Sequence, residues 1–502
     1  MSFEEKLAKL RELYTEQNLL TGIGALLGWD QQVYMPSGGA ETRGAQMAYI
    51  GGLAHQKATA PEVGQLIDDL AAEIPDLDAD DDLAREIKLA KRNFDHSAKI
   101  PTDKMMEFIR VTSLAHEAWT KAKTDSDFAV FQPHLEKILN LTKEMVSFFA
   151  PYDHPYDPLI DMYEVGMTAA EVKSIFDALR PRQVELLRRI AEKPQVDDSF
   201  AHTEYDIETQ KKLNNYLATL QGYDWNRGRL DETVHPFTTG FGLDDVRITT
   251  HYYLNMPLSA MFSTLHETGH ALYEQGLSRA YHNTALGGTN SMAVHESNSR
   301  LWENVIGRSK EFWRFLYPIA QAFFPANLGN VSSDQFYRGI NKVTPSFIRI
   351  EADEATYNLH IMLRLELELA MIEDKIQVKD LPELWMSKMK EYLGVTPPDD
   401  ARGVLQDVHW SGGMIGYFPT YALGNLLAVQ WWNQMLSDLP NIPDEMAAGK
   451  LDSILTWLRE NVHRHSSRYT AQELVRKVTG EGINPDHYMN YLTKKYTEIY
   501  DL

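Results

Sequence analysis

The chain has 502 residues, of which 43% are hydrophobic and 11% aromatic, so it can bury a large core and is not disordered. It contains no cysteine, which excludes disulfides, thiol catalysis and zinc–thiolate sites and leaves His, Asp and Glu as metal ligands. The formal net charge of -22 argues against nucleic acid or an anionic membrane as a partner.

The first residues predict a helix rather than an export signal. Phe3, Leu7, Leu10 and Tyr14 recur at helical spacing among charged residues, without the apolar centre of a signal peptide. No uninterrupted apolar run reaches the roughly 18 residues that a membrane-spanning helix needs. We therefore expect a cytoplasmic protein that does not interact with a membrane.

Amphipathic helical patterns dominate the chain. They cover residues 3–20, 82–96, 104–125, 134–150, 169–193, 207–221, 301–323, 354–373, 382–393, 422–437, 452–463 and 471–477. Pro181 predicts a break or kink in the fifth of these, and residues 74–81 suit an acidic loop. Alternation typical of strands is limited to residues 236–242 and 246–253. We expect a mainly α protein with very little β structure. Residues 1–502 should form a single domain, which can consist of two helical lobes.

The clearest chemical signal is the sequence His266-Glu267-Thr-Gly-His270, inside a predicted helix that begins near Pro257 and ends at Gly276. Histidines four residues apart lie on one face of a helix, so both imidazoles can bind one metal ion. Glu267 stands beside them and can act as the general base that activates water. Two exposed histidines on a surface helix are the alternative, but the apolar stripe on this helix argues against it.

A third metal ligand is expected downstream, because catalytic zinc usually takes three protein ligands and keeps one position open. Glu296 follows the motif across a Gly287-Gly288 loop that would let a second helix fold back. We favour Glu296, since two histidines and a glutamate form a thermolysin-type set, with His295 as the competing ligand. Zinc is the expected metal, one ion per chain, although cobalt or manganese would support the same chemistry.

Further motifs occur in order along most of the chain, at residues 29–36 (WDQQVYMP), 235–237 (HPF), 245–249 (DVRIT), 266–270 (HETGH), 295–299 (HESNS), 348–353 (IRIEAD) and 403–410 (GVLQDVHW). In this series the chain resembles the thermostable carboxypeptidase family, also called the carboxypeptidase Taq family. Asn298 is the one departure, where the family more often has Gln.

The resemblance implies a large helical metallopeptidase fold with a deep groove, like the neurolysin and angiotensin-converting peptidases. It also implies a homodimer that removes C-terminal residues from peptides with broad preference. In the single domain expected above, two helical lobes would then flank the groove.

A carboxypeptidase must bind the free α-carboxylate of its substrate, and the planar fork of arginine suits this anion. Arg349 is the first candidate, with a helical salt bridge to Glu351 or Asp353 as the alternative, and Arg247 could bind substrate or brace the groove. Asp353 or Asp407 could be a carboxylate that orients a ligand histidine.

Peptide hydrolysis also develops negative charge on the carbonyl oxygen, and a hydrogen-bond donor aimed there lowers the barrier by about 3 kcal/mol. His409 and Tyr421 are the candidates for this catalytic role, each with a buried structural role as the alternative. His235 is a candidate for lining the substrate pocket, and Gln406 for contacting the substrate from the segment that carries His409.

The predicted function is thus a zinc-dependent carboxypeptidase that acts on peptides with a free C-terminus and uses Glu267 as general base. One alternative is an oligopeptide endopeptidase with the same zinc site. The other is a helical binding protein with a structural metal, against which Glu267 argues, because such a site has no use for a base beside an open position.

Overall fold

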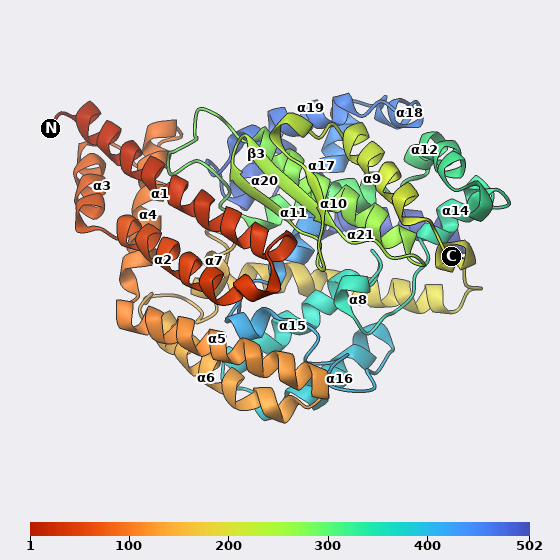
Figure 1. The fold of residues 1–502 in the computed structure, drawn as a ribbon, viewed down its shortest axis with the longest axis horizontal. Helices are drawn as coiled ribbons and strands as arrows, with labels where there is room; N and C mark the ends of the chain where they lie inside the picture. Colours follow the sequence, from red (N-terminus) through yellow and green to blue (C-terminus); the bar gives the residue numbers. More distant parts are fainter.

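The computed structural model describes residues 1–502 except for the side chain of Thr102 (Figure 1). The helices before the small sheet are α1 (Phe3–Val33), α2 (Ala40–Ala58), α3 (Pro61–Glu73), α4 (Asp82–Lys99), α5 (Thr102–Asp125), α6 (Phe128–Ser147), α7 (Asp157–Asp161), α8 (Ala169–Ala191) and α9 (Ile207–Gln221).

Helices also make up most of the second half of the chain. They are α10 (Pro257–Gly276), α11 (Met292–Arg300) with a π-helical continuation (Leu301–Ile306), α12 (Lys310–Phe323), α13 (Pro325–Leu328), α14 (Ser333–Ile340), α15 (Tyr357–Ile372), α16 (Leu381–Leu393), α17 (Pro419–Asp438), α18 (Ile442–Ala447), α19 (Asp452–Asn461), α20 (Ala471–Thr479) and α21 (Pro485–Tyr500). The prediction of a mainly α protein with very little β structure is confirmed. Among the described residues, no helix combines the length and apolar character needed to cross a membrane.

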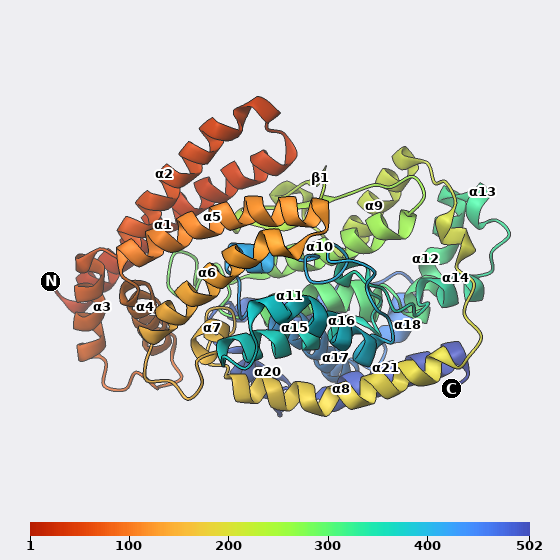
Figure 2. The same cartoon turned by 90° about the horizontal axis from the view of Figure 1, so that it is seen from below.

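The first helix is long and begins at a well-formed cap. Ser2 and Glu5 form a capping box, in which each side chain binds the other residue's backbone N–H. Figures 1 and 2 show α1 and α2 running side by side at the outside of the molecule. The start of α1 packs on α3 and α4 around a small separate core that includes Leu10, Ile67 and Ile87.

Three short strands form one sheet, with the order β1-β3-β2. The strand β1 (Leu230–Glu232) runs parallel to β3 (Asp245–Thr250), and β2 (Thr238–Gly242) pairs antiparallel with β3. Val246 and Ile248 of β3 are buried on one face, which explains the alternation seen in the sequence. The strands β2 and β3 pack against α10, so this sheet lies beside the predicted metal-binding helix.

The largest core surrounds α10, α11, α15 and α17. Nearly every residue of α15 and most of α17 are buried, so these helices are enclosed on all sides rather than along one stripe. Trp302, Trp385 and Trp431 are among the largest side chains that are almost fully buried there. This central packing fixes the helices that carry the candidate site.

Several predicted boundaries were wrong for identifiable reasons. The helix α8 continues through Pro181, so the predicted break does not occur there. The helix predicted over 301–323 is divided, since the chain leaves the π-helical segment at Ile306 and begins α12 anew at Lys310, with Ser309 as the N-cap. The helix predicted over 3–20 extends to Val33, and α2, α3 and α21 were not predicted.

Candidate metal centre and substrate site

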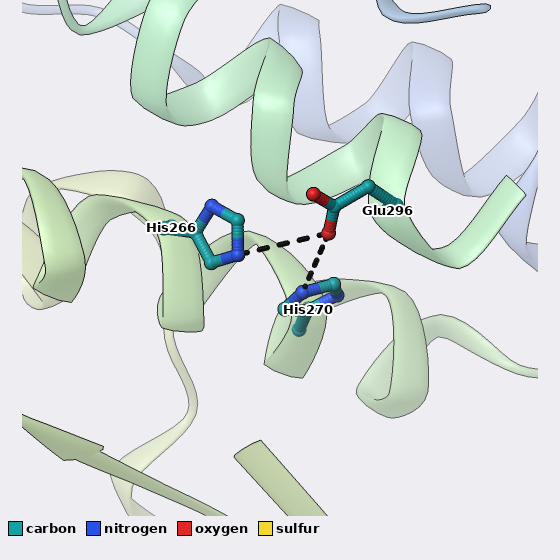
Figure 3. Close-up of side chains that lie close together, drawn as sticks. All are labelled: His266, His270 and Glu296. Atoms are coloured by element: carbon teal, nitrogen blue, oxygen red, sulfur yellow. Dashed lines mark ion pairs between the residues drawn. The ribbon is translucent and has the colours of Figure 1, made fainter. Parts of the chain in front are cut away.

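The histidine motif lies on α10 as predicted. Pro257 occupies the first turn of this helix, and its buried apolar residues hold it against the core. His266 and His270 lie one turn apart on the same face, with their ring centroids 4.8 Å from each other. Both imidazoles therefore point toward one position, and Figure 3 shows them together with Glu296.

Glu296 comes to this position from the neighbouring helix α11. Its Oε2 atom lies 3.2 Å from Nε2 of His270 and 3.7 Å from Nε2 of His266, and one ligand atom from each residue lies within 4.8 Å of the others (Figure 3). Ligand atoms about 2.0–2.1 Å from a tetrahedral zinc ion lie roughly 3.3 Å apart. The spacing and the two-nitrogen, one-oxygen donor set both fit a zinc-type ion.

Two glycines allow the helices to come this close. A Cβ at Gly269, within the histidine motif, would lie 2.7 Å from Cα of Ser299. A Cβ at Gly424 on α17 would lie 2.6 Å from Cγ of Glu296. Glycine at both positions therefore lets α10 and α17 approach α11 closely, and the contact at Gly424 limits where the side chain of Glu296 can lie.

A carboxylate that the sequence did not single out holds His266. Oε2 of Glu303 lies 2.8 Å from Nδ1 of His266, so this ring nitrogen donates and Nε2 stays free to bind a metal ion. Burial opposes ionisation of Glu303, but the charge of Arg300 together with the hydrogen bond and charge of His266 outweighs it and lowers the pKa of Glu303 to about 2. Glu303 reaches the site because the helix continues past Arg300 in π-helical geometry, which is common at functional sites.

Arg300 also holds the proposed ligand Glu296. Its Nε donates to Oε1 of Glu296 at 2.6 Å, and its Nη1 lies 3.3 Å from Oε2 of Glu303. One oxygen of Glu296 is thus bound to arginine while the other faces the histidines. The spacing of Glu296 and Arg300, four residues apart on a helix, is a sequence signal that could have identified this pair.

Glu267 lies beside the two histidines and is almost completely buried. The hydroxyl of Thr238 on β2 donates to Oε2 of Glu267 at 2.7 Å, so the edge of the sheet orients this carboxylate. Burial raises the pKa of Glu267 above its usual value. A buried carboxylate with a raised pKa is suited to take up a proton near neutral pH.

The competing ligand His295 lies away from the converging atoms. Its Nε2 lies 2.8 Å from Oε1 of Glu274, and its ring packs on that of His270 with the centroids 4.5 Å apart. Glu274 is four residues after His270 on α10, so both lie on the same face of that helix. The ring of His295 therefore packs against His270 while its Nε2 is bound to Glu274. The geometry therefore favours Glu296 over His295 as the third ligand.

Arg349 lies in a buried cluster built around Asp407. Its Nη2 lies 2.9 Å from Oδ1 of Asp407, and the fully buried Arg364 donates from Nε to Oδ2 of the same carboxylate at 2.6 Å. The partner of Arg349 is thus neither Glu351 nor Asp353, which were the expected alternatives. Two guanidiniums share one carboxylate, so this cluster has an excess positive charge.

The predicted role of Asp407 or Asp353 in orienting a ligand histidine was wrong. Asp407 is occupied by the two arginines, while Asp353 accepts hydrogen bonds from the backbone N–H groups of Thr344, Ala355 and Thr356 and so fixes the start of α15. These roles differ from the prediction because folding brings backbone N–H groups to Asp353 and two arginines to Asp407, so neither carboxylate is left to bind a histidine. The carboxylate that orients a histidine of the motif through its Nδ1 atom is Glu303.

The polar groups of Gln406 are used within the protein. Its Oε1 accepts from the backbone N–H of Arg349 at 2.9 Å and from Nη2 of Arg364 at 2.8 Å, and its Nε2 donates to backbone carbonyls that include that of Phe347. An amide oxygen has two lone pairs, so both are engaged. Gln406 braces the arginine cluster in this arrangement rather than presenting a free group to a ligand.

His409 and Tyr421 are brought together as the sequence suggested. The Nε2 of His409 lies 3.1 Å from the hydroxyl of Tyr421, across the loop that precedes α17. Burial lowers the pKa of His409 to about 4, so its ring is neutral near pH 7. Burial also raises the pKa of Tyr421 well above its usual value, so the phenol keeps its proton and can donate a hydrogen bond.

The two remaining candidates lie on or next to the small sheet. Arg247 pairs through Nη2 with Asp245 at 2.8 Å and stacks over the ring of Trp29 on α1 at 4.4 Å, an arrangement that braces α1 on the sheet. His235 is exposed in the loop between β1 and β2, three residues before Thr238. Neither belongs to the set of atoms that converges near His266.

Comparisons with known proteins identify the family of this chain. A family described as carboxypeptidase Taq (M32) metallopeptidase matches residues 9–496. Thermostable carboxypeptidase 1 of Thermus thermophilus is 40% identical over 510 residues, which cover 100% of both chains. Carboxypeptidase 1 of Bacillus subtilis is 40% identical over 477 residues, 95% of each chain.

A solved structure has the same fold over its full length. The crystal structure of an M32 carboxypeptidase from Deinococcus radiodurans R1 matches with a TM-score of 0.96 at 38% identity, covering 99% of this chain and 100% of that chain. The resemblance seen in the motif series is confirmed, and the carboxypeptidase names of the relatives do not favour the endopeptidase alternative. The chain belongs to the carboxypeptidase Taq (M32) family and is a metallocarboxypeptidase, a hydrolase that acts on peptides.

Proposed function

We propose that this metallocarboxypeptidase uses one zinc ion, held by His266, His270 and Glu296, to release single C-terminal residues from peptides with broad preference. The convergence of these three ligand atoms within 4.8 Å is the observation that carries the proposal. Two imidazoles and one carboxylate suit zinc, and cobalt or manganese could support the same chemistry.

The proposed mechanism divides the reaction between the metal and the residues around it. A metal ion bound here would polarise the peptide carbonyl and make water more acidic. Glu267 removes the proton from the attacking water and passes it to the departing amine, while Thr238 keeps the carboxylate oriented. Tyr421 donates a hydrogen bond to the carbonyl oxygen as negative charge develops, and His409 fixes the orientation of the phenol.

The C-terminal carboxylate is proposed to bind Arg349. The three hydrogen bonds of this guanidinium, two to Asp407 and one to Tyr357, leave two of its five N–H groups. The excess positive charge of the cluster around Asp407 supports binding of an anion at this place. We propose that Gln406 supports this arginine instead of touching the substrate, that Arg247 braces the sheet, and that His235 lines the outer part of the substrate path.

The wider organisation is proposed on the strength of the family resemblance. The single chain would form one domain over residues 1–502 with two helical lobes flanking a deep groove, and the enzyme would act as a homodimer in the cytoplasm. Sedimentation of the purified protein measures whether it is a dimer, and fractionation of the native host measures whether it is cytoplasmic.

One comparison of substrates tests the proposed specificity. The parent enzyme should cut a peptide with a free C-terminus and cut the matching peptide amide poorly. Losing a hydrogen-bonded charge pair of about 1.5–3 kcal/mol should lower kcat/KM of Arg349→Ala roughly 10- to 150-fold on the free acid and change the amide rate little. If only Arg247→Ala shows the selective loss, the choice of arginine is wrong. Equal rates on acid and amide in the parent would contradict carboxylate recognition altogether.

A further inference from the structure

A single tyrosine contacts both an arginine beside the candidate metal centre and the arginine proposed to bind the substrate carboxylate. Tyr357 lies at the first position of α15 and is 4% exposed. The guanidinium of Arg300 lies over its ring, 4.2 Å from the centroid, and its hydroxyl accepts a hydrogen bond from Nη1 of Arg349 at 2.8 Å. The same side chain therefore binds two cations through two different groups, its aromatic face and its oxygen.

Each of these arginines holds a different part of the site. Arg300 donates from Nε to Oε1 of the proposed metal ligand Glu296 at 2.6 Å. Arg349, in the turn before α15, is the residue proposed to bind the substrate carboxylate. The contacts thus run without interruption from Glu296 through Arg300 and Tyr357 to Arg349.

Tyrosine is suited to this place for a physical reason. Two buried guanidiniums near each other repel, and each needs a partner that offsets its charge. The negative face of an aromatic ring attracts one cation, while the phenol oxygen accepts a hydrogen bond from the other. Phenylalanine offers only the ring, and an aliphatic side chain offers neither.

We propose that Tyr357 is a positioning residue that sets the separation between the metal site and the carboxylate-binding arginine, and thereby the register in which the last peptide bond meets Glu267. This inference rests on the role proposed for Arg349. It goes beyond that role because it assigns the spacing of the two subsites to one side chain that touches neither substrate nor metal.

Two substitutions separate the two contacts. Tyr357→Phe keeps the ring under Arg300 and removes the acceptor for Arg349. It should lower kcat/KM on a free-acid peptide by about 10-fold or more, mainly through KM, and leave the peptide amide rate and the zinc affinity unchanged. Tyr357→Leu removes both contacts and should also weaken zinc binding about 10- to 100-fold, measured by competition with a chelating indicator and without turnover.

The released products give an independent readout of register. The parent should release single residues, and Tyr357→Leu should release dipeptides as well, measured by mass spectrometry of the products. A Phe variant that equals the parent on free acids, or a Leu variant with parental zinc affinity and only single-residue products, would overturn the proposal. If Tyr357→Leu fails to fold, the Phe variant still tests whether Tyr357 positions Arg349 for the substrate carboxylate.

A matched control and a double-mutant cycle complete the test. Tyr205→Phe removes another buried hydroxyl, which bonds the carbonyl of Phe200, and should change neither substrate selectivity nor zinc affinity. In the Arg349→Ala background, Tyr357→Phe should have no further effect on the free-acid rate, whereas additive losses would contradict action through Arg349. If Arg349→Ala itself shows no selective loss, the proposed carboxylate subsite fails. If Arg349→Ala shows that loss and Tyr357→Phe does not, only the role of Tyr357 fails.

Discussion

Nδ1 of His266 lies 2.8 Å from Oε2 of Glu303, and this contact determines which nitrogen of the ring faces the candidate metal position. A carboxylate at Nδ1 holds the proton on that nitrogen, leaves the lone pair of Nε2 directed toward Glu296, and makes the ring a better donor to a metal ion. By contrast, Nδ1 of His270 is buried without a hydrogen-bond partner among the described residues. The two histidines of one motif are therefore oriented by different means, the first by a carboxylate and the second by packing.

Glu303→Gln should weaken zinc binding about 10- to 100-fold while the fold is kept, because the amide is a poorer acceptor for the imidazole N–H. Zinc affinity is measured by competition with a chelating indicator, and circular dichroism checks the fold. Glu366→Gln is a matched control, since Glu366 also pairs with an arginine, Arg180, and lies outside the site. Parental zinc affinity in the Glu303 variant would show that this contact does not support the metal site.

Glu267→Gln should retain zinc and stability but lose about 10² to 10⁴ in kcat, the usual effect of removing a general base. The amide can still accept the hydrogen bond from Thr238, so the local arrangement is kept. Metal content and the thermal midpoint are measured on the same preparation as the rate. Turnover within a few-fold of the parent would remove Glu267 from its proposed role.

Gly424→Ala should separate α17 from α11, because the new methyl group would lie 2.6 Å from Cγ of Glu296. Overpacking of this kind costs typically 1–3 kcal/mol, and zinc affinity should fall in parallel because Glu296 moves. Gly44→Ala is the matched control. Gly44 lies in α2 with nothing within 4 Å of its added Cβ, so alanine should stabilise the helix by about 0.5–1 kcal/mol. Equal effects of the two substitutions would contradict the close approach at Gly424.

Glu164→Gln should change how stability depends on pH. Glu164 is buried and accepts hydrogen bonds from Ser291 and from the backbone N–H of Ala293 at the start of α11, and burial raises its pKa from 4.5 to about 8. Between these pH values the folded state binds more protons than the unfolded state, so the free energy of unfolding decreases as pH rises. One group contributes at most about 1.4 kcal/mol per pH unit.

The glutamine variant lacks this titrating group, so its free energy of unfolding should decrease less between about pH 5 and pH 8 than that of the parent. Denaturant titrations at several pH values measure the slope. Glu185→Gln, at an exposed position on α8, should leave the slope close to that of the parent. Identical slopes for the parent and Glu164→Gln would show that Glu164 does not titrate in this window.

Much of the site follows from local sequence because it depends on helical spacing. The four-residue interval between His266 and His270 places both rings on one face of any helix, and the apolar stripe around them predicts that helix. Glu296 could be expected because it follows a glycine loop at the start of a second helix. These relationships involve few residues and one regular geometry, so they can be read before the chain is folded.

The remaining relationships depend on contacts between distant segments. Arg349 and Asp407 are separated by 58 residues, and their pairing became visible only when the turn before α15 met the loop before α17. The sequence could not show that Glu303 would orient His266, because this contact needs the π-helical turn after Arg300, which changes the helical register. The sequence by itself determined the helix that carries the histidine motif, the candidate general base beside it and the family. Tertiary structure decided which carboxylate contacts which histidine and that Arg349 pairs with Asp407, because buried charges take the partners that packing brings within hydrogen-bond distance.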